Sequence, residues 1–492
     1  MADGQFSMTT IIVTLAAIVD LGIKAAAVVL IPRNRRPSTA MAWLLAIFLI
    51  PYVGLLLFLL LGSAHLPKSR RAKQHEIDTL ITNASNQLHL EPDQSKWPSW
   101  LPSVVELTTT VGALPVVSGN SAHLHRDYEE GIAAMAADIL TARRFVHVEF
   151  YIIAFDETTS EFFAAMETAV KRGVKVRVLL DHIASIRSVG HRKTFAELDR
   201  IGVEWSFMLP VQPLKGKWQR PDLRNHRKLV VVDGRIGWVG SQNMIDRSYS
   251  KPGNLKRGLQ WQELMSRVTG PVVTEINVIF LGDWYCETGE KIVHEDVAVE
   301  EILATPASGA LDCQIVPSGP GFDNENNLRL FLALVYAAQK RVIITSPYFV
   351  PDEAMMYAIT SSVQRGLDVQ LFVSEIGDQL PVFHAQRSYY GELLRAGVTI
   401  WRYPAPYILH AKHVSIDDDV AVIGSSNMDI RSFALDLEVS MLVRGREFVD
   451  EMREVEAGYR AIGRQLTLDE WQKQPLTSTM VDGLARLTSA LQ

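Results

Sequence analysis

Two long apolar stretches dominate the N-terminal part of the chain. Residues 11–31 are almost entirely apolar, and residues 42–61 contain no charged side chain. A helix needs about 20 apolar residues to cross a bilayer, and the opening residues "MADGQFSM" lack the positive charge that starts a signal peptide. We therefore predict a transmembrane hairpin over residues 1–66, with spans at about residues 11–31 and 42–61.

Charged residues in and around these spans refine the prediction. Asp20 and Lys24 are four residues apart, which places them on one helix face, so we expect them to pair with each other. A hairpin puts residues 1–10 and the main body on the same side of the membrane. Positive charge marks the cytoplasmic side, but the two flanks are nearly balanced. The cations are Arg33, Arg35 and Arg36 in the connector, and Lys68, Arg70, Arg71 and Lys73 after the second span.

The apolar pattern changes character beyond a polar linker at residues 67–115. Residues 145–181 and residues 341–374 each read as a strand, a helix that stops at Arg-Gly, and a second apolar strand. Glycine after the last helical turn is a typical stop signal. Strand, helix and strand of this length predict a βαβ unit, and hence an α/β fold with a parallel or mixed sheet in each half.

A shorter repeat lies inside this frame. The stretch "NHRKLVVVDGRIGWVGSQN" at residues 225–243 matches "LHAKHVSIDDDVAVIGSSN" at residues 409–427. The spacing within the two copies is the same. Six of the identical positions pair His226, Lys228, Asp233, Gly240, Ser241 and Asn243 with His410, Lys412, Asp417, Gly424, Ser425 and Asn427. We therefore predict a first domain over residues 116–303, with its motif at 220–247, and a second over residues 311–492, with its motif at 404–431.

Local geometry indicates how the spacing shared by the two copies could build a site. Residues 229–232 form an apolar strand, and alternation along it puts His226 and Lys228 on one face. Asp233-Gly234 is a hairpin signal, whereas the second copy is expected to turn at Asp418-Asp419. The returning strand would then carry serine and asparagine back toward the histidine and lysine.

Two such copies would gather two histidines, two lysines and two asparagines. Lysine is a poor metal ligand, and we predict neither a metal nor a cofactor. Lysine and asparagine donors suit the oxygens of a phosphodiester. One histidine can attack phosphorus while the other exchanges protons with the alcohols, and we favour His226 as the nucleophile.

The remaining polar residues have alternative roles. Asp233 and Asp417 could orient a histidine, fix the hairpin, or simply serve as turn residues. We group them with the two histidines and the two lysines as candidate catalytic residues. Glu263 and Glu438 follow each motif and could orient a histidine, or they could be solvated carboxylates at a strand edge. Together with Ser241, Asn243, Ser425 and Asn427, these two glutamates are our candidates for substrate binding.

His-x-Lys-x4-Asp followed by Gly-Ser-x-Asn, present twice, is similar to the phospholipase D superfamily. The segments "SPYFVPD" at 346–352 and "WQELMSRVTGPVV" at 261–273, together with the apolar N-terminus, resemble bacterial cardiolipin synthases. The resemblance implies two pseudo-symmetric α/β/α domains sharing one site. It also implies condensation of two phosphatidylglycerols into cardiolipin and glycerol without a nucleotide, on the cytoplasmic face of the bacterial inner membrane.

Composition leaves some alternatives open. The net charge of −6 and pI of about 6.1 argue against a general nucleic-acid binder. The basic segment at 214–228 could meet nucleic acid or anionic lipid headgroups, and the two predicted membrane spans favour the lipids. The two cysteines, Cys286 and Cys313, cannot form a disulfide framework. A membrane-bound phospholipase D or nuclease that uses water as acceptor is the main alternative, and a non-catalytic scaffold is another. The oligomeric state is left open.

Overall fold

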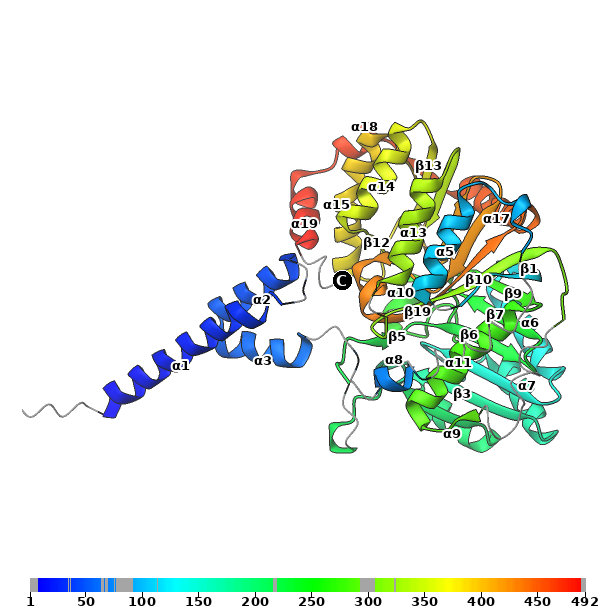
Figure 1. The fold of residues 1–492 in the computed structure, drawn as a ribbon, viewed down its shortest axis with the longest axis horizontal. Coiled ribbons are helices and arrows are strands. Elements are labelled where there is room, and N and C mark those ends of the chain that lie inside the picture. The colour runs from blue at the N-terminus through cyan, green and yellow to red at the C-terminus, as the bar shows by residue number, and fades with distance from the viewer. Residues whose placement is uncertain are drawn as a thin grey trace, which may run out of the picture. The chain divides into compact units, whose positions relative to one another are not determined.

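The computed structural model describes residues 8–33, 35, 37–62, 66, 70–74, 76, 92–112, 114–215, 219–292, 306–322 and 324–487. Arg36, Lys68 and residues 216–218 of the basic segment lie outside this part of the chain. The chain divides into a smaller unit, residues 1–66 with 220–222, and a larger unit, residues 67–219 with 223–492. Figure 1 shows the ribbon coloured along the chain.

The smaller unit contains three apolar helices: α1 (Met8–Leu30), α2 (Pro37–Leu49) and α3 (Pro51–Leu61). Thr10–Leu30 is the one described helix that is long and apolar enough to cross a membrane. Asp20 and Lys24 pair as predicted, with Nζ 2.7 Å from Oδ2.

The predicted second span is not one uninterrupted helix. It breaks at Ile50, because Pro51 lacks an N–H and starts α3 at its first turn. Gly54 permits a sharp bend there, since a Cβ at this position would lie 2.5 Å from the carbonyl oxygen of Ala46.

The larger unit is built on a mixed sheet of 16 strands in the described residues. The first half of the sheet has the order β1-β9-β7-β6-β2-β3-β4. These strands are β1 (Val117–His125), β2 (Phe145–Phe150), β3 (Lys175–Asp181), β4 (Glu204–Met208), β6 (Lys228–Val232), β7 (Ile236–Gly240) and β9 (Met265–Thr269).

The second half continues the sheet in the order β10-β19-β17-β16-β11-β13-β14-β20. Its strands are β10 (Leu311–Ser318), β11 (Arg341–Thr345), β13 (Asp368–Ser374), β14 (Thr399–Tyr403), β16 (His413–Ile416), β17 (Val420–Gly424), β19 (Asp436–Arg444) and β20 (Arg464–Leu466). Antiparallel pairing of β1 with β10 joins the two halves.

Both predicted βαβ units are confirmed. In the first, α7 (Ser160–Lys171) connects the parallel strands β2 and β3. In the second, α14 (Glu353–Gln364) connects the parallel strands β11 and β13. The Asp233-Gly234 turn is also present, between the antiparallel strands β6 and β7.

Helices cover both halves (Figure 1). The first half carries α6 (Tyr128–Leu140), α7, α8 (His182–Arg187), α9 (His191–Ile201), α10 (Pro252–Arg257) and α11 (Val272–Thr288). The second carries α13 (Asn326–Ala337), α14, α15 (Leu380–Ala396), α16 (Ile430–Ala434), α17 (Arg446–Ile462), α18 (Leu468–Gln472) and α19 (Leu476–Arg486).

Part of the predicted linker joins the core of the second half. Helix α5 (Leu101–Gly112) buries Leu101 and Val104 in the same apolar cluster as Val316 and Leu334. Trp97, just before this helix, donates from its indole nitrogen to Asp312, 2.6 Å away. Burial of these side chains ties residues 97–112 to the sheet; the predicted domain bounds themselves stay a prediction.

Candidate active site

Two short strands carry the repeated histidines across the boundary between the halves. β5 (Arg224–Asn225) pairs in parallel with β19 of the second half, and β15 (Tyr407–Leu409) pairs in parallel with β8 (Gln260–Gln262) of the first. The pairing continues into the histidines themselves. The backbone N–H of His226 donates to Leu437 O at 2.8 Å, and that of His410 donates to Gln262 O at 2.7 Å.

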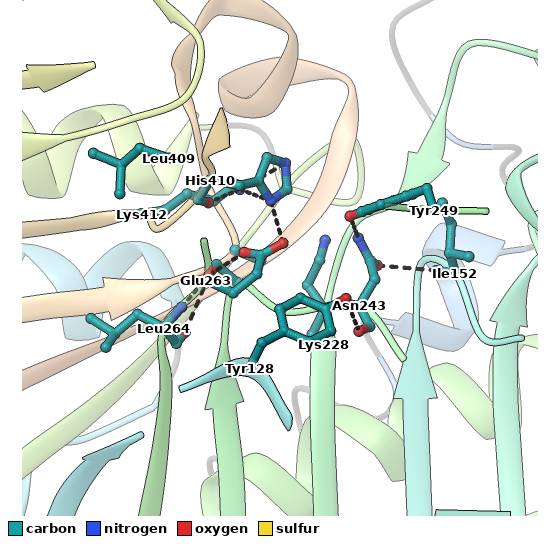
Figure 2. A network of polar contacts seen from close by, with 12 residues as sticks. Tyr128, Ile152, Lys228, Asn243, Tyr249, Glu263, Leu264, Leu409, His410 and Lys412 are labelled. Carbon is teal, nitrogen blue, oxygen red and sulfur yellow. Dashed lines mark hydrogen bonds and ion pairs between the residues drawn. The ribbon is translucent and has the colours of Figure 1, made fainter. Parts of the chain in front are cut away.

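Each histidine therefore meets a glutamate of the opposite half. Nδ1 of His226 lies 2.9 Å from Oε1 of Glu438, and Nδ1 of His410 lies 2.7 Å from Oε1 of Glu263. Both glutamates are almost fully buried, so the alternative of solvated carboxylates at a strand edge is wrong. Figure 2 shows Glu263 next to the His410 ring.

The partners of His226 fix its tautomer. Nδ1 also lies 3.0 Å from the carbonyl oxygen of Ser425, and a carbonyl can only accept. Nδ1 therefore carries the proton, and in the neutral ring Nε2 keeps its lone pair. A neutral imidazole with a free Nε2 is the form that can act as a nucleophile.

The two predicted serines hold the glutamates. Ser241 donates its hydroxyl proton to Oε2 of Glu263 at 2.6 Å, and Ser425 donates in the same way to Glu438. Each serine oxygen also accepts a backbone N–H, from Leu264 and Val439 respectively. Because a hydroxyl has one proton, the geometry does not support the prediction that these serines bind substrate directly; it makes them supports for the carboxylates.

Two buried lysines stand beside the histidines. Lys228 donates to the backbone oxygen of His226, and Lys412 donates to that of His410 at 2.7 Å. Nζ of Lys412 also lies 3.1 Å from Nδ1 and 3.2 Å from Nε2 of the His410 ring. Burial lowers the pKa of Lys228 to about 7 and that of Lys412 to about 8, although Glu438 and Glu263 favour their charged forms.

The two histidine–glutamate pairs differ in charge. Burial lowers the pKa of both histidines, and neighbouring lysines add to this effect. Burial also raises the pKa of Glu438 to about 7. At Glu263 the burial effect is outweighed by His410, Lys412 and Ser241, so its pKa lies below the ordinary value. Glu263 is thus the more firmly ionised carboxylate, which favours the doubly protonated, charged ring at His410 over the same form at His226.

Models of known protein families match the parts of the chain that carry this arrangement. The family model described as "Cardiolipin synthase, PLD-like domain" matches residues 135–284 and 331–456, which contain both motifs, and the model "Phospholipase_D-nuclease N-terminal" matches residues 12–63. The chain belongs to the cardiolipin synthase family. The predicted resemblance is confirmed.

Individual relatives agree with this assignment. Cardiolipin synthase A of Pectobacterium carotovorum subsp. carotovorum is 33% identical over 470 residues, covering 94% of each chain. Cardiolipin synthase A of Proteus mirabilis is 31% identical over 481 residues, covering 93% of this chain and 94% of the other. The crystal structure of phosphatidylserine synthase from Haemophilus influenzae Rd KW20 shares the fold, with a TM-score of 0.60, 14% identity, and coverage of 79% of this chain and 99% of that one.

Asp233 and Asp417 do not lie against the histidines in this family member. The carboxylate of Asp233 accepts the backbone N–H groups of Arg143, Arg144 and Phe145 at 2.8–3.0 Å. Asp417 accepts those of residues 339–341 in the same way. Asp233 follows β6 at the end away from Lys228, roughly 16 Å along the strand. The geometry therefore corrects their placement among the catalytic residues: both aspartates fix the chain where β2 and β11 begin.

The two predicted asparagines have different surroundings. Oδ1 of Asn243 accepts the backbone N–H of Ile152 at 3.2 Å, and Nδ2 donates to the hydroxyl of Tyr249 at 2.7 Å (Figure 2). In the second half, Oδ1 of Asn427 is buried and has no hydrogen-bond partner among the described residues. Phe433 occupies the place that corresponds to Tyr249.

Tyr249 and Arg227 are residues that the sequence analysis missed. Tyr249 fixes Asn243, as above. Arg227 is buried, donates from Nε to the backbone oxygen of Glu438 at 3.1 Å, and pairs with Asp283. Aligning the repeat six residues past each asparagine would have exposed the difference between "RSY" at 247–249 and "RSF" at 431–433. Likewise Arg227 stands opposite Ala411, a difference visible between the two copies.

Proposed function

We propose that this protein is a cardiolipin synthase, which transfers a phosphatidyl group from one phosphatidylglycerol to the hydroxyl of another and releases glycerol. The observation that carries the proposal is the similarity over 94% of the chain to proteins named cardiolipin synthase A. The enzyme class predicted from the two repeated motifs is confirmed by the same relatives. A hydrolase that uses water as the acceptor is not favoured by them.

In the proposed first step, Nε2 of His226 attacks the phosphorus of the donor lipid. An N–P bond forms, the P–O bond to the headgroup glycerol breaks, and His410 gives its proton to the departing oxygen. The tautomer of His226, which leaves Nε2 unprotonated, supports this assignment. The ionised Glu263 beside His410 stabilises a charged ring there, which supports the role of His410 as the proton donor.

In the second step the hydroxyl of another phosphatidylglycerol attacks the phosphorus. His410 takes the hydroxyl proton, the new P–O bond forms, and the N–P bond to His226 breaks. One phosphodiester replaces another, so the step needs no nucleotide. Lys228, Lys412, Asn243 and Asn427 are the donors proposed for the phosphate oxygens, where negative charge accumulates in the transition state. We expect no metal requirement, which a chelator such as EDTA tests directly: loss of turnover restored by a single specific metal would contradict the metal-free step.

The arrangement in the membrane is also part of the proposal. Helices α1 to α3 would form a hairpin with both termini on the cytoplasmic side of a bacterial inner membrane, holding the site near its lipid substrates. The apolar span Thr10–Leu30 and the match of residues 12–63 to the N-terminal family model support it. The corresponding strand orders in the two halves of the sheet support a pseudo-twofold relation between them.

Product analysis tests the proposed function. Purified protein in mixed micelles with phosphatidylglycerol as the sole phospholipid should form cardiolipin and free glycerol in equal amounts, with little phosphatidic acid. A well-placed hydroxyl can compete with water at about 55 M because oriented groups reach effective molarities of about 10⁵ M or more. Added glycerol should drive the reaction backwards. Phosphatidic acid as the main product would instead identify a hydrolase.

A further inference from the structure

Helix α19 has its apolar side chains on the outside. Met480 and Leu484, one turn apart, are 66% and 64% exposed, and Leu476 and Leu487 extend the same stripe. The inner stripe is Ser478, Asp482 and Ala485, and Asp482 is the one buried residue of the helix. Surface helices ordinarily place the apolar stripe inward and the polar one outward, so the amphipathic pattern of α19 is inverted.

Polar contacts hold this helix on the body of the protein. Oδ1 of Asp482 accepts from Nδ1 of His384 on α15 at 2.7 Å, and Oδ2 accepts from Nε of Arg387 at 3.2 Å. Arg387 also donates to the hydroxyl of Ser478 at 3.0 Å. Because these bonds already fix α19 to α15, its apolar stripe is free to contact another partner, and an exposed apolar stripe of this kind marks an interaction site.

The apolar stripe is linked to the active site through α15. Leu380, the first residue of α15, is 67% exposed. Two residues earlier, Asp378 accepts a hydrogen bond from the hydroxyl of Tyr348 at 3.0 Å. The Tyr348 ring in turn lies 6.1 Å from the His410 ring. The rim of the site, taken as Tyr348 and residues 377–380, thus lies at the start of α15, the helix on which α19 packs.

Positive charge borders the same rim. Arg257, at the end of α10, donates to the backbone oxygen of Gly377 at 3.0 Å. The segment 251–257 exposes Leu255 together with Lys251, Lys256 and Arg257, and it contains no acidic residue. On α19 the one exposed charged residue is Arg486, whose Nη2 lies 3.7 Å from Oε2 of Glu392 on α15. Cations beside exposed leucines are complementary to anionic headgroups above an acyl layer.

We propose that these residues form a lipid-facing surface, made of Leu255, Lys256, Leu380, Met480 and Leu484, which rests on a bilayer rich in anionic phospholipid. The apolar side chains enter the boundary between headgroups and acyl chains, and the cations contact headgroup phosphates. The inference rests on the proposed function for its lipid substrate. It adds to that function a surface that presents the substrate, because a lipid held there has its headgroup at the rim next to Tyr348 and His410.

Fluorescence quenching tests the surface independently of catalysis. The full chain, with Cys286 and Cys313 replaced by alanine, receives a single environment-sensitive label at Met480→Cys or Leu484→Cys. It is reconstituted in vesicles of phosphatidylglycerol and phosphatidylcholine. Lipids with a nitroxide on the acyl chain should quench both labels. Leu140→Cys on α6, an exposed leucine of another helix, is the matched control and should not be quenched.

An activity measurement adds a second, separable readout. The variant Met480→Gln/Leu484→Gln should lose rate several-fold on vesicles but much less on short-chain, monomeric phosphatidylglycerol. Thr479→Gln, on the flank of the helix, should retain both rates.

The possible outcomes separate the two proposals. If the unmodified protein forms no cardiolipin from vesicles or from monomeric lipid, the proposed function is refuted, and the quenching result still shows whether the surface contacts the bilayer. Labels at 480 and 484 that are unquenched, or quenched no more than the Leu140 control, would overturn the proposal. A dimer in detergent that the double glutamine variant dissociates, with the labels unquenched, would assign the surface to a second copy.

Discussion

His226 and Glu438 are 212 residues apart in the sequence, yet Nδ1 of the histidine lies 2.9 Å from Oε1 of the glutamate. In the second pair, His410 and Glu263 are 147 residues apart in the sequence, and Nδ1 of the histidine lies 2.7 Å from Oε1 of the glutamate. Each half of the large unit thus supplies the carboxylate that orients the histidine of the other half. The crossed contacts therefore bring the two repeated motifs together.

The crossed pairs predict which variants act through which histidine. Glu438→Gln should lower the rate of cardiolipin formation roughly 10²- to 10⁴-fold, because the amide cannot stabilise a charged ring or enforce the tautomer of His226. Glu263→Gln should do the same through His410. If Glu438 acts only through His226, the variant His226→Ala/Glu438→Gln should be no slower than His226→Ala alone. A Glu438→Gln enzyme with nearly full activity would contradict the assignment.

The identity of the nucleophile can be read from a trapped intermediate. His410→Ala protein lacks the group proposed to protonate the first alcohol and to deprotonate the second. With a donor lipid whose leaving group needs no proton, such as phosphatidyl-p-nitrophenol, the phosphatidyl group should accumulate on His226 as an acid-labile phosphoramidate. Mass spectrometry of peptides from protein incubated with this donor locates the adduct. An adduct on His410 in the His226→Ala protein would reverse the two roles.

The sequence predicted the elements that are local along the chain. The βαβ units, the turn at Asp233-Gly234 and the two His-x-Lys motifs all follow from short-range periodicity and turn chemistry. The pairing of each histidine with the opposite glutamate did not, because it depends on the β5–β19 and β15–β8 pairings, which join segments more than a hundred residues apart. No spacing rule within one repeat contains that information.

Two other features of the structure have physical causes that the sequence contained only in part. Pro51 was a visible signal that the second apolar run would break, although its hydropathy looked continuous. The aspartates of the motifs were grouped with the catalytic residues because they share the repeat. Their true partners, backbone amides about 90 residues earlier for Asp233, have no sequence signature.

These amide contacts predict that Asp233→Asn is a stability variant. An uncharged amide is a weaker acceptor for three N–H groups, so the free energy of unfolding should fall by about 1–3 kcal/mol. Asparagine tolerates the positive φ of 52° at this position, so backbone strain is not added. Thermal unfolding in detergent should show the loss, while turnover per folded molecule is retained. His226→Ala should show the opposite pattern, and Asp417→Asn should resemble Asp233→Asn.

The hydroxyl of Tyr249 offers a finer test of the site. Tyr249→Phe removes the acceptor that fixes the Asn243 amide, so kcat should fall about three- to tenfold, the rate equivalent of one neutral hydrogen bond. Tyr390→Phe is a matched control, because its hydroxyl accepts from the side-chain amide of Gln386 at the same distance of 2.7 Å and is also buried. That control should reduce stability and leave kcat unchanged. Equal effects of both variants on kcat would show that the Asn243 amide is not the link.

The buried lysines predict how the rate depends on pH. A lysine loses its charge as the pH rises through its folded-state pKa, which is about 7 for Lys228 and about 8 for Lys412. Both ammonium groups face the phosphate in the proposed mechanism, so kcat/KM, which reports the free enzyme, should fall on the alkaline side with an apparent pKa between about 7 and 8. The two lysines titrate as a coupled pair, so the apparent pKa of the alkaline limb is a property of both groups.

Substrate binding and substitution should each move this limb. A bound phosphodiester anion favours the charged form of the lysines, so the alkaline limb of kcat should lie at higher pH than that of kcat/KM. Lys228→Arg keeps a charge at all accessible pH values and removes the lower of the two pKa values, so it should move the limb upward even if its maximal rate is lower. Lys340→Arg, a substitution of an exposed lysine, should leave the profile unchanged. An alkaline limb that stays in place in Lys412→Arg and in Lys228→Arg would show that neither ammonium group controls it.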